Sequence, residues 1–347
     1  MEKLCYIVPE YNSASPSHFS YLNDWVNNLK KYFNLFLISE DDGKFKMLLS
    51  ILRAYSSGYR DFYIHYSFLG ALASSLLTRC FGGRTFYWNC GLPWNYKRNI
   101  FRDLFERMTY KTVTFLVTGT EGLKKEYAEH YGLSLDKIKV MPNWINIDSI
   151  KYQISNIKTV ELREELNIKD QKLLLFVHRL SRRKGAHYLP KILDKLRDEN
   201  IVMVIIGDGP ERDLLKLEIN NLKLEDKVRF LGWVPHDQII SYFAAANIFI
   251  MPSEEEGFPH VLLEAMVLGI PFVAFNVGGV GEMLASDLSE CVIESGSIND
   301  FVGAVKRILS DQKLFLKISE NEKNYIKIFN THKVIEIFRK MLVNNSL

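Results

Sequence analysis

The sequence predicts an α/β fold with two doubly wound parallel sheets. Short apolar runs typical of buried parallel strands alternate with segments of helical spacing along most of the chain. A polar segment at about residues 151–170 interrupts this alternation. With 347 residues the chain is also too long for one ordinary core, and it fits two domains of roughly 150 to 200 residues each.

We assign the first domain to residues 1–150. It opens with an apolar strand at 4–8, a segment of helical spacing at 19–32 and a second strand at 35–38, which together form a βαβ unit. The further strands expected are 62–65, 85–88, 112–117 and 138–141, and the further helices are 68–80, 99–110 and 122–131.

We assign the second domain to residues 151–330, where the same alternation recurs with a different sequence. The expected strands are 173–177, 201–206, 228–231, 248–251 and 272–275, and the expected helices are 160–166, 188–198, 211–222, 236–245 and 259–268. After residue 290 the pattern is helical, at 301–309, 314–329 and 333–342. Ligands of such sheets bind beyond the carboxyl ends of the strands, so two domains facing a cleft are expected.

Composition and charge narrow the class of protein. A 47% hydrophobic and 24% charged chain is typical of a globular protein, and a net charge of +3 gives no reason to expect nucleic acid binding. The four cysteines form no Cys-x-x-Cys pair, which predicts neither a zinc site nor a disulfide framework. Without a secretory pattern or a convincing membrane span, we expect a cytoplasmic protein.

Two carboxylates flank a predicted helix start near Pro259. Glu256 precedes it and Glu264 follows within the helix, whose side chains lean toward its N-terminus. The backbone N–H groups of Gly257, Phe258 and His260 point the same way and favour oxygen-rich ligands. A solvated acidic turn is the alternative, but the apolar neighbours of Glu264 imply burial, and a buried carboxylate needs partners.

A cluster of cations follows the predicted strand 173–177. Arg179 and Lys184 belong to a run with four cations in six positions, at the end of a strand where ligands bind. Arginine offers a fork and lysine a point charge, so the cluster suits a diphosphate. A solvated basic turn is the alternative.

The pattern Glu-Gly-Phe-Pro-x4-Glu-Ala-Met, with seven residues between the glutamates, resembles the motif of family 4 of the retaining glycosyltransferases, which have the GT-B fold. The resemblance implies that Glu256 lies against a donor sugar and that Glu264 binds the ribose of the sugar nucleotide. It assigns the diphosphate to Arg179 and Lys184, and it makes Glu256, Arg179 and Lys184 the expected catalytic residues. It also implies that a last helix at 331–347 crosses back to the first domain.

Further site residues follow from the same resemblance. Trp233 and Val234 would cradle the base, Gly278 and Gly279 would lie beside the donor, and Gly257, Phe258 and His260 would line its site. Packing for the tryptophan and a tight turn for the glycines are the alternatives.

The sequence also departs from the family pattern. His178 stands where the family often has glycine, and a loop with Ser15, Ser17 and His18, which we expect to contact the acceptor, replaces a glycine pair. A catalytic histidine, if one is needed, would be His18 or His65.

The absence of an Asp-x-Asp pair predicts no metal site, so Arg179, Lys184 and helix N-termini would meet the charge of the leaving group. The implied function is metal-independent, retaining transfer of a hexose or N-acetylhexosamine to a glycan or lipid-linked acceptor. The nucleoside diphosphate sugar is the donor substrate, and no cofactor is expected. A non-catalytic GT-B subunit that supports a partner transferase and a sugar-nucleotide epimerase are the alternatives.

Residues 97–111 combine five cations with Trp94, Tyr96, Phe101 and Phe105 in and around a predicted helix. Such a helix suits a peripheral contact with an anionic membrane, here the inner face, where a lipid-linked acceptor would be met. A surface helix packed by its aromatic stripe is the alternative.

Overall fold

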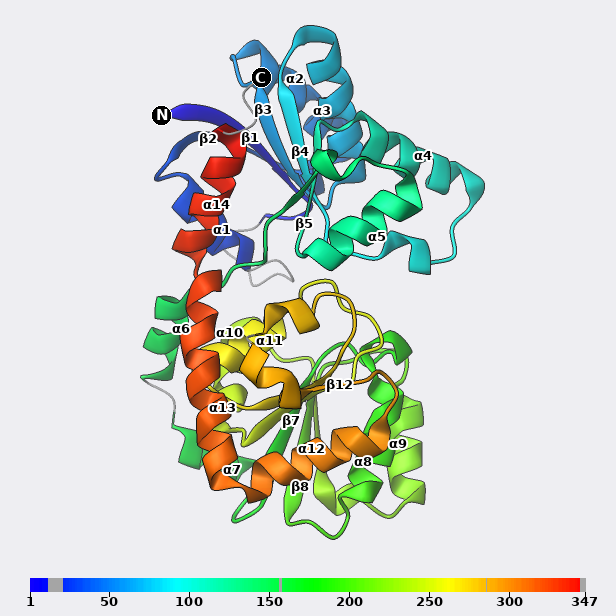
Figure 1. The fold of residues 1–347 in the computed structure, drawn as a ribbon, viewed down its shortest axis with the longest axis vertical. Helices are drawn as coiled ribbons and strands as arrows, with labels where there is room; N and C mark the ends of the chain where they lie inside the picture. Colours follow the sequence, from blue (N-terminus) through cyan, green and yellow to red (C-terminus); the bar gives the residue numbers. More distant parts are fainter. Residues whose placement is uncertain (12–20, 156–157, 285, 344–347) are drawn as a thin grey trace. The chain divides into compact units, whose positions relative to one another are not determined.

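The computed structural model describes residues 1–11, 21–155, 158–284 and 286–343. The chain divides into two compact units, unit 1 at Met1–Asn143 with Thr331–Leu347 and unit 2 at Trp144–Asn330 (Figure 1). Each unit contains one six-stranded parallel sheet with helices around it. The predicted α/β class with two parallel sheets is therefore confirmed.

The sheet of unit 1 has the strand order β2-β1-β3-β4-β5-β6. Its strands are β1 (Glu2–Val8), β2 (Phe33–Ser39), β3 (Asp61–His65), β4 (Arg84–Trp88), β5 (Phe115–Thr118) and β6 (Ile138–Val140). The helices are α1 (Tyr21–Leu29), α2 (Lys44–Ser56), α3 (Phe68–Phe81), α4 (Ile100–Thr112), α5 (Glu121–Tyr131) and α14 (Thr331–Val343).

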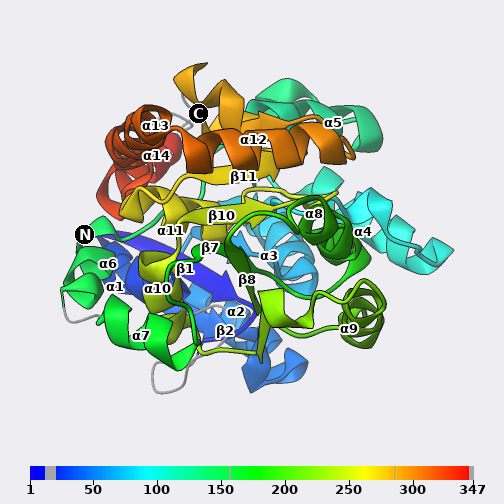
Figure 2. The same cartoon turned by 90° about the horizontal axis from the view of Figure 1, so that it is seen from below.

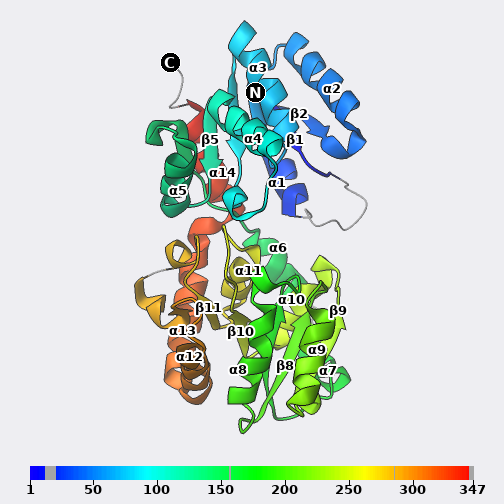
Figure 3. The same ribbon diagram turned by 90° about the vertical axis from the view of Figure 1, so that its right-hand side faces the viewer.

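The last helix, α14, packs within unit 1 beside α1 (Figures 1 and 3). The Phe338 ring lies 4.7 Å from that of Tyr63 and 6.1 Å from that of Trp25. The Thr331 hydroxyl donates to Asp24 Oδ2 at 3.1 Å at the start of the helix. Two distant stretches of the chain therefore share one core.

The sheet of unit 2 has the strand order β12-β11-β10-β7-β8-β9, which is that of the Rossmann fold. Its strands are β7 (Lys172–Val177), β8 (Ile201–Ile206), β9 (Val228–Gly232), β10 (Ile248–Met251), β11 (Phe272–Phe275) and β12 (Val292–Ile293). The helices are α6 (Ile147–Ile154), α7 (Thr159–Glu165), α8 (Leu189–Lys195), α9 (Arg212–Asn221), α10 (His236–Ala245), α11 (His260–Leu268), α12 (Ile298–Ser310) and α13 (Gln312–Tyr325). Figure 2 shows α12 and α13 together on one side of β10 and β11.

Some elements differ from the expectation. Helix α2 was not predicted, because exposed apolar residues interrupt its buried positions Met47, Ile51 and Ala54. Strand β5 begins at Phe115, so the predicted start at residue 112 was wrong. Thr112 ends α4, where its hydroxyl donates to the Met108 carbonyl at 2.9 Å. No helix in the described part of the chain is long and apolar enough to cross a bilayer.

Candidate active site

The topology of unit 2 gathers three loops at one edge of its sheet. Strands β11, β10 and β7 are neighbours and run parallel, so the loops after them emerge side by side. The chain order reverses between β7 and β10, and ligands of doubly wound sheets bind at such a point. Most of the residues predicted to be catalytic or to bind the donor lie on these three loops.

Two glycines allow the loops to touch. Gly185, at a φ of 74°, would place a Cβ 1.8 Å from the Pro252 carbonyl oxygen, and Gly278, at 52°, would place one 1.7 Å from that of Glu256. Any side chain would force the loops apart. The N–H of Gly279 also donates to the Gly257 carbonyl at 3.1 Å, which ties the loop after β11 to the loop after β10.

Glu256 lies where the loop after β10 contacts the loops after β7 and β11. Its side chain is almost fully buried, with 4% of the residue exposed. The ammonium of Lys184 lies 2.7 Å from Oε1, and the Nε2 atom of His178 lies 2.9 Å from the same oxygen. No described residue gives Oε2 a hydrogen bond, so that oxygen keeps its capacity to accept one from a ligand.

The electrostatics keep Glu256 ionised. Burial alone raises the pKa of this carboxyl, but the charge of Lys184 and the contacts from His178 and Lys184 outweigh it and hold the pKa well below its usual range. Burial and the neighbouring Lys184 lower the pKa of His178. A neutral His178 therefore donates from Nε2 to the carboxylate, a tautomer that we assign from this contact.

The acidic triplet is not a solvated turn. The guanidinium of Arg183 donates to Glu255 Oε1 at 3.1 Å, and the Tyr188 hydroxyl donates to Glu254 Oε1 at 2.9 Å. The loop after β10 is thus bound to the loop after β7 at each glutamate. Arg179 differs from these residues, because it is exposed and no described residue accepts its hydrogen bonds.

Glu264 forms a second carboxylate position on α11. It is 3% exposed, and its Oε1 lies 2.7 Å from Nε2 of His236. The other oxygen, Oε2, is buried and has no partner among the described residues. The hydrogen bond and charge of Glu264 raise the pKa of His236, against the opposing effect of burial. A ligand hydroxyl is the kind of group that would satisfy Oε2.

The ends of α11 are close to the expectation. Pro259 is the N-cap residue and not the first helical residue, so the helix begins at His260. Gly269 ends the helix in the left-handed conformation, at a φ of 63°.

The remaining predicted residues are scattered around this site. Trp233 is 59% exposed after β9, Val234 is buried, and the Phe258 ring packs 5.5 Å from Phe329. Burial and the nearby His236 lower the pKa of His260 to about 3, so it is neutral at physiological pH.

Four of the candidate residues belong to the first domain. Ser15, Ser17 and His18 lie outside the described residues. His65 is fully buried in unit 1, where its ring stacks 4.2 Å from Trp88.

Two histidines of the site were not predicted. His178 was noted only as a departure from a family pattern, although its place directly after β7 was a signal. His236 begins α10 after β9, at the same edge of the sheet, but nothing in the sequence linked it to Glu264.

The second half of the chain is similar to known proteins. Residues 158–325 match the model of the family described as Glycosyl transferases group 1. An uncharacterized glycosyltransferase of Methanocaldococcus jannaschii is 33% identical over 201 residues, which is 56% of this chain and 51% of the relative. The alpha-D-kanosaminyltransferase of Streptomyces kanamyceticus is 30% identical over 176 residues, 50% of this chain and 46% of the relative. The matches thus span about half the length of these curated relatives.

The fold is shared over the whole chain. HepE of Anabaena, solved in complex with UDP and glucose, aligns with a TM-score of 0.79 over 99% of this chain and 100% of that chain, at 18% identity. The family model thus places residues 158–325, most of unit 2, in the group 1 glycosyl transferases, and the chain as a whole has the GT-B fold.

Proposed function

We propose that the chain is a retaining, metal-independent glycosyltransferase that moves a hexose or N-acetylhexosamine from a nucleoside diphosphate sugar to a glycan or lipid-linked acceptor. The observation that carries the proposal is the buried, ionised Glu256, which Lys184 and His178 hold through one oxygen. Its other oxygen remains able to accept a hydrogen bond from a sugar hydroxyl. The position at the strand-order reversal of unit 2 supports the same conclusion.

The donor would be held at three points. Oε2 of Glu264, buried without a partner among the described residues, would accept hydrogen bonds from the ribose hydroxyls. Glu256 would contact the sugar. Trp233 and Val234 would flank the base, and the exposed Trp233 ring offers a face for stacking.

The diphosphate would lie against the cations after β7. An ammonium has three donors, and Lys184 uses two of them, on Glu256 Oε1 at 2.7 Å and on the Glu255 carbonyl at 3.4 Å. The third is left for a phosphate oxygen, and the unpaired Arg179 offers a fork. These charges would stabilise the leaving diphosphate as the glycosidic bond breaks, and that diphosphate would take the proton of the acceptor hydroxyl.

The relatives support the class of donor. One curated relative is named a kanosaminyltransferase, and a neighbour in fold was solved with UDP and glucose. A hexose or an amino hexose on a nucleoside diphosphate is therefore the first donor to test. A lipid-linked acceptor would also require contact with a membrane, which is a question separate from the transfer reaction.

The test is to incubate the purified chain with a panel of nucleoside diphosphate sugars and to measure donor hydrolysis and transfer to glycan and lipid-linked acceptors. Lys184→Ala should lower kcat by roughly 100-fold or more, because it removes charge stabilisation from the leaving group. Glu264→Gln should raise the donor KM by about tenfold, since it weakens the acceptor for the ribose. Lys195→Ala, at an exposed position on α8, is the matched control and should change neither.

Each alternative predicts a different result. Nucleotide binding without hydrolysis or transfer, for every donor, would indicate a non-catalytic subunit. Conversion of the sugar without an acceptor would indicate an epimerase. Wild-type kinetics in both variants would refute the site.

A further inference from the structure

Helix α4 lies at an edge of unit 1 (Figure 1). Four of its large apolar residues are exposed to solvent. Ile100 is 78% exposed, Phe101 81%, Leu104 63% and Met108 43%. The spacing of four between Ile100, Leu104 and Met108 puts them in one row, with Phe101 beside it. We call these four residues the α4 face.

The α4 face is not the stripe that the sequence predicted. Trp94 packs 4.9 Å from the Tyr127 ring, and Phe105 packs 6.5 Å from Phe68, so both turn toward unit 1. Only Phe101 of the predicted aromatic residues in α4 points outward, and aliphatic side chains and a methionine complete the face. One side of the segment is therefore packed by aromatic residues, as the alternative expected. The other side has apolar residues that are exposed to solvent.

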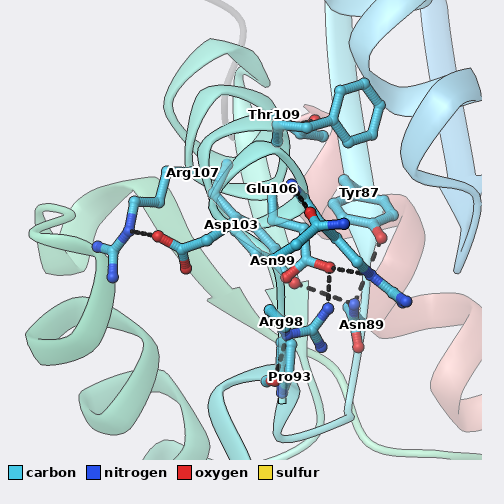
Figure 4. A network of polar contacts seen from close by, with 12 residues as sticks. Tyr87, Asn89, Pro93, Arg98, Asn99, Asp103, Glu106, Arg107 and Thr109 are labelled. Atoms are coloured by element: carbon cyan, nitrogen blue, oxygen red, sulfur yellow. Dashed lines mark hydrogen bonds and ion pairs between the residues drawn. The ribbon is translucent and has the colours of Figure 1, made fainter. Parts of the chain in front are cut away.

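The start of α4 is fixed, so the face is presented on a rigid element. The side chain of Asn99 caps the helix and accepts from the Arg102 N–H at 2.8 Å. Arg98 donates from Nε to the Pro93 carbonyl at 2.6 Å and also pairs with Glu106 (Figure 4). These contacts tie the loop before the helix to its second turn.

The two carboxylates of the segment are both neutralised by arginine. Glu106 is 1% exposed and accepts from Arg98 and, at 3.1 Å, from Arg102, while Asp103 accepts from Arg107 at 2.7 Å (Figure 4). Lys97 and Lys111 are exposed, and their ammonium groups have no partner among the described residues.

The net charge of the chain is concentrated here. The whole chain has 44 basic and 41 acidic residues, and residues 97–111 hold five and two of them. Outside this segment 39 of each sign remain, so the excess of +3 equals the charge of this one segment.

We propose that the α4 face binds the surface of a bilayer that contains anionic phospholipid. The four apolar side chains would enter the interfacial region, and Lys97 and Lys111 would lie at the phosphates of the headgroups. Each cation near such a surface contributes about 1 kcal/mol, and apolar residues add to it. A second copy of the chain is a poor occupant, since pairing two such faces would bring like charges together.

The inference goes beyond the transfer reaction and does not depend on it. Vesicle binding is measured without a sugar nucleotide, and transfer is measured with a water-soluble acceptor. Either result can fail while the other holds.

The test is co-sedimentation of the full chain with vesicles of mixed phosphatidylglycerol and phosphatidylcholine, and with vesicles of phosphatidylcholine alone. The chain should bind the anionic vesicles at least tenfold more tightly, and salt at ~0.5 M should weaken the binding because the Debye length falls. Phe101→Ser with Leu104→Ser, and separately Lys97→Glu with Lys111→Glu, should each reduce binding about tenfold or more.

The controls have matched exposure and charge. Phe45→Ser changes a phenylalanine that is 76% exposed on α2, and Lys44→Glu with Lys125→Glu makes the same change in net charge elsewhere on unit 1. Both should bind as the wild type does. Equal binding to neutral vesicles, absence of binding, or equal losses in the controls would overturn the inference. Self-association that Phe101→Ser abolishes, without vesicle binding, would assign the face to a second copy instead.

Discussion

The ion pair between Glu256 and Lys184 compensates for the burial of a carboxylate. Removing a carboxylate from water costs several kcal/mol, which is recovered only with good partners. Lys184 supplies the charge, and His178 supplies a second hydrogen bond on the same oxygen. Substitution of Lys184 therefore leaves a buried charge unpaired, so its kinetic effect is meaningful only alongside a measured Tm.

Glu322 on α13 is the contrasting case. It is fully buried, and neither of its carboxylate oxygens has a partner among the described residues. Burial raises its pKa well above the usual range, with Lys323 opposing this only in part. The carboxyl is thus protonated in the folded protein over a range of pH in which it is ionised in the unfolded chain.

Glu322→Gln should stabilise the protein at neutral pH. Because the folded pKa is the higher one, the wild type loses stability as the pH rises from the unfolded value, about 4.3, to the folded value. Glutamine cannot ionise and avoids this loss. A gain of at least about 1 kcal/mol is expected at pH ~7 and should disappear near pH 4, since one pKa unit is worth about 1.4 kcal/mol. Denaturation measured against pH tests it, and an equal effect at both pH values would contradict the assignment.

At the scale of elements, the site depends on how closely the loops approach one another. Three strand ends bring the loops to one edge of the sheet, and two glycines remove the side chains that would separate them. The glycine pair at Gly278 was predicted to lie beside a ligand. In the structure Gly278 lies against the backbone of Glu256, and the absence of a side chain at Gly278 lets the two loops come this close.

Gly278→Ala should cost activity more than stability. The new Cβ would stand 1.7 Å from the Glu256 carbonyl oxygen, so the loop and Glu256 must move by about an ångström, and such a displacement costs roughly 100-fold in rate. Gly132→Ala is the control, because Gly132 has a left-handed φ of 63° with nothing within 4 Å of the added Cβ. It should lose only about 1–2 kcal/mol of stability and keep its kcat/KM. Equal kcat/KM in the two variants would show that the approach at Gly278 is unimportant.

At the scale of the whole molecule, α14, from the C-terminal end of the sequence, completes the hydrophobic core of unit 1. Phe338 of α14 is fully buried among aromatic rings, with Phe33 at 6.0 Å in addition to Tyr63 and Trp25. The core of unit 1 is therefore incomplete until the last helix has been made.

Phe338→Ala should destabilise unit 1 by about 3–5 kcal/mol, through lost burial and the cavity that remains. Hydrogen exchange in β1 and β3 should accelerate, while exchange in β7 and β8 of unit 2 should not change. Ile337→Ala, at a position 38% exposed on the same helix, is the control and should cost less than about 1 kcal/mol. Slow exchange in β1 and β3 of the Phe338 variant would mean that unit 1 is stable without this packing.

The sequence by itself determined the α/β class, the order of most strands and helices, the loops that carry Glu256, Arg179 and Lys184, and the helix that carries Glu264. These features follow from local periodicity and from the proline and glycine residues that mark the ends of helices. Both signals depend only on residues that are neighbours along the chain. Only the tertiary structure decided that His178 and His236 are the partners of the two glutamates, and that α4 turns its apolar side outward. Those facts depend on which strands are neighbours and which helix face is covered, and contacts between distant residues leave no periodic signal in the sequence.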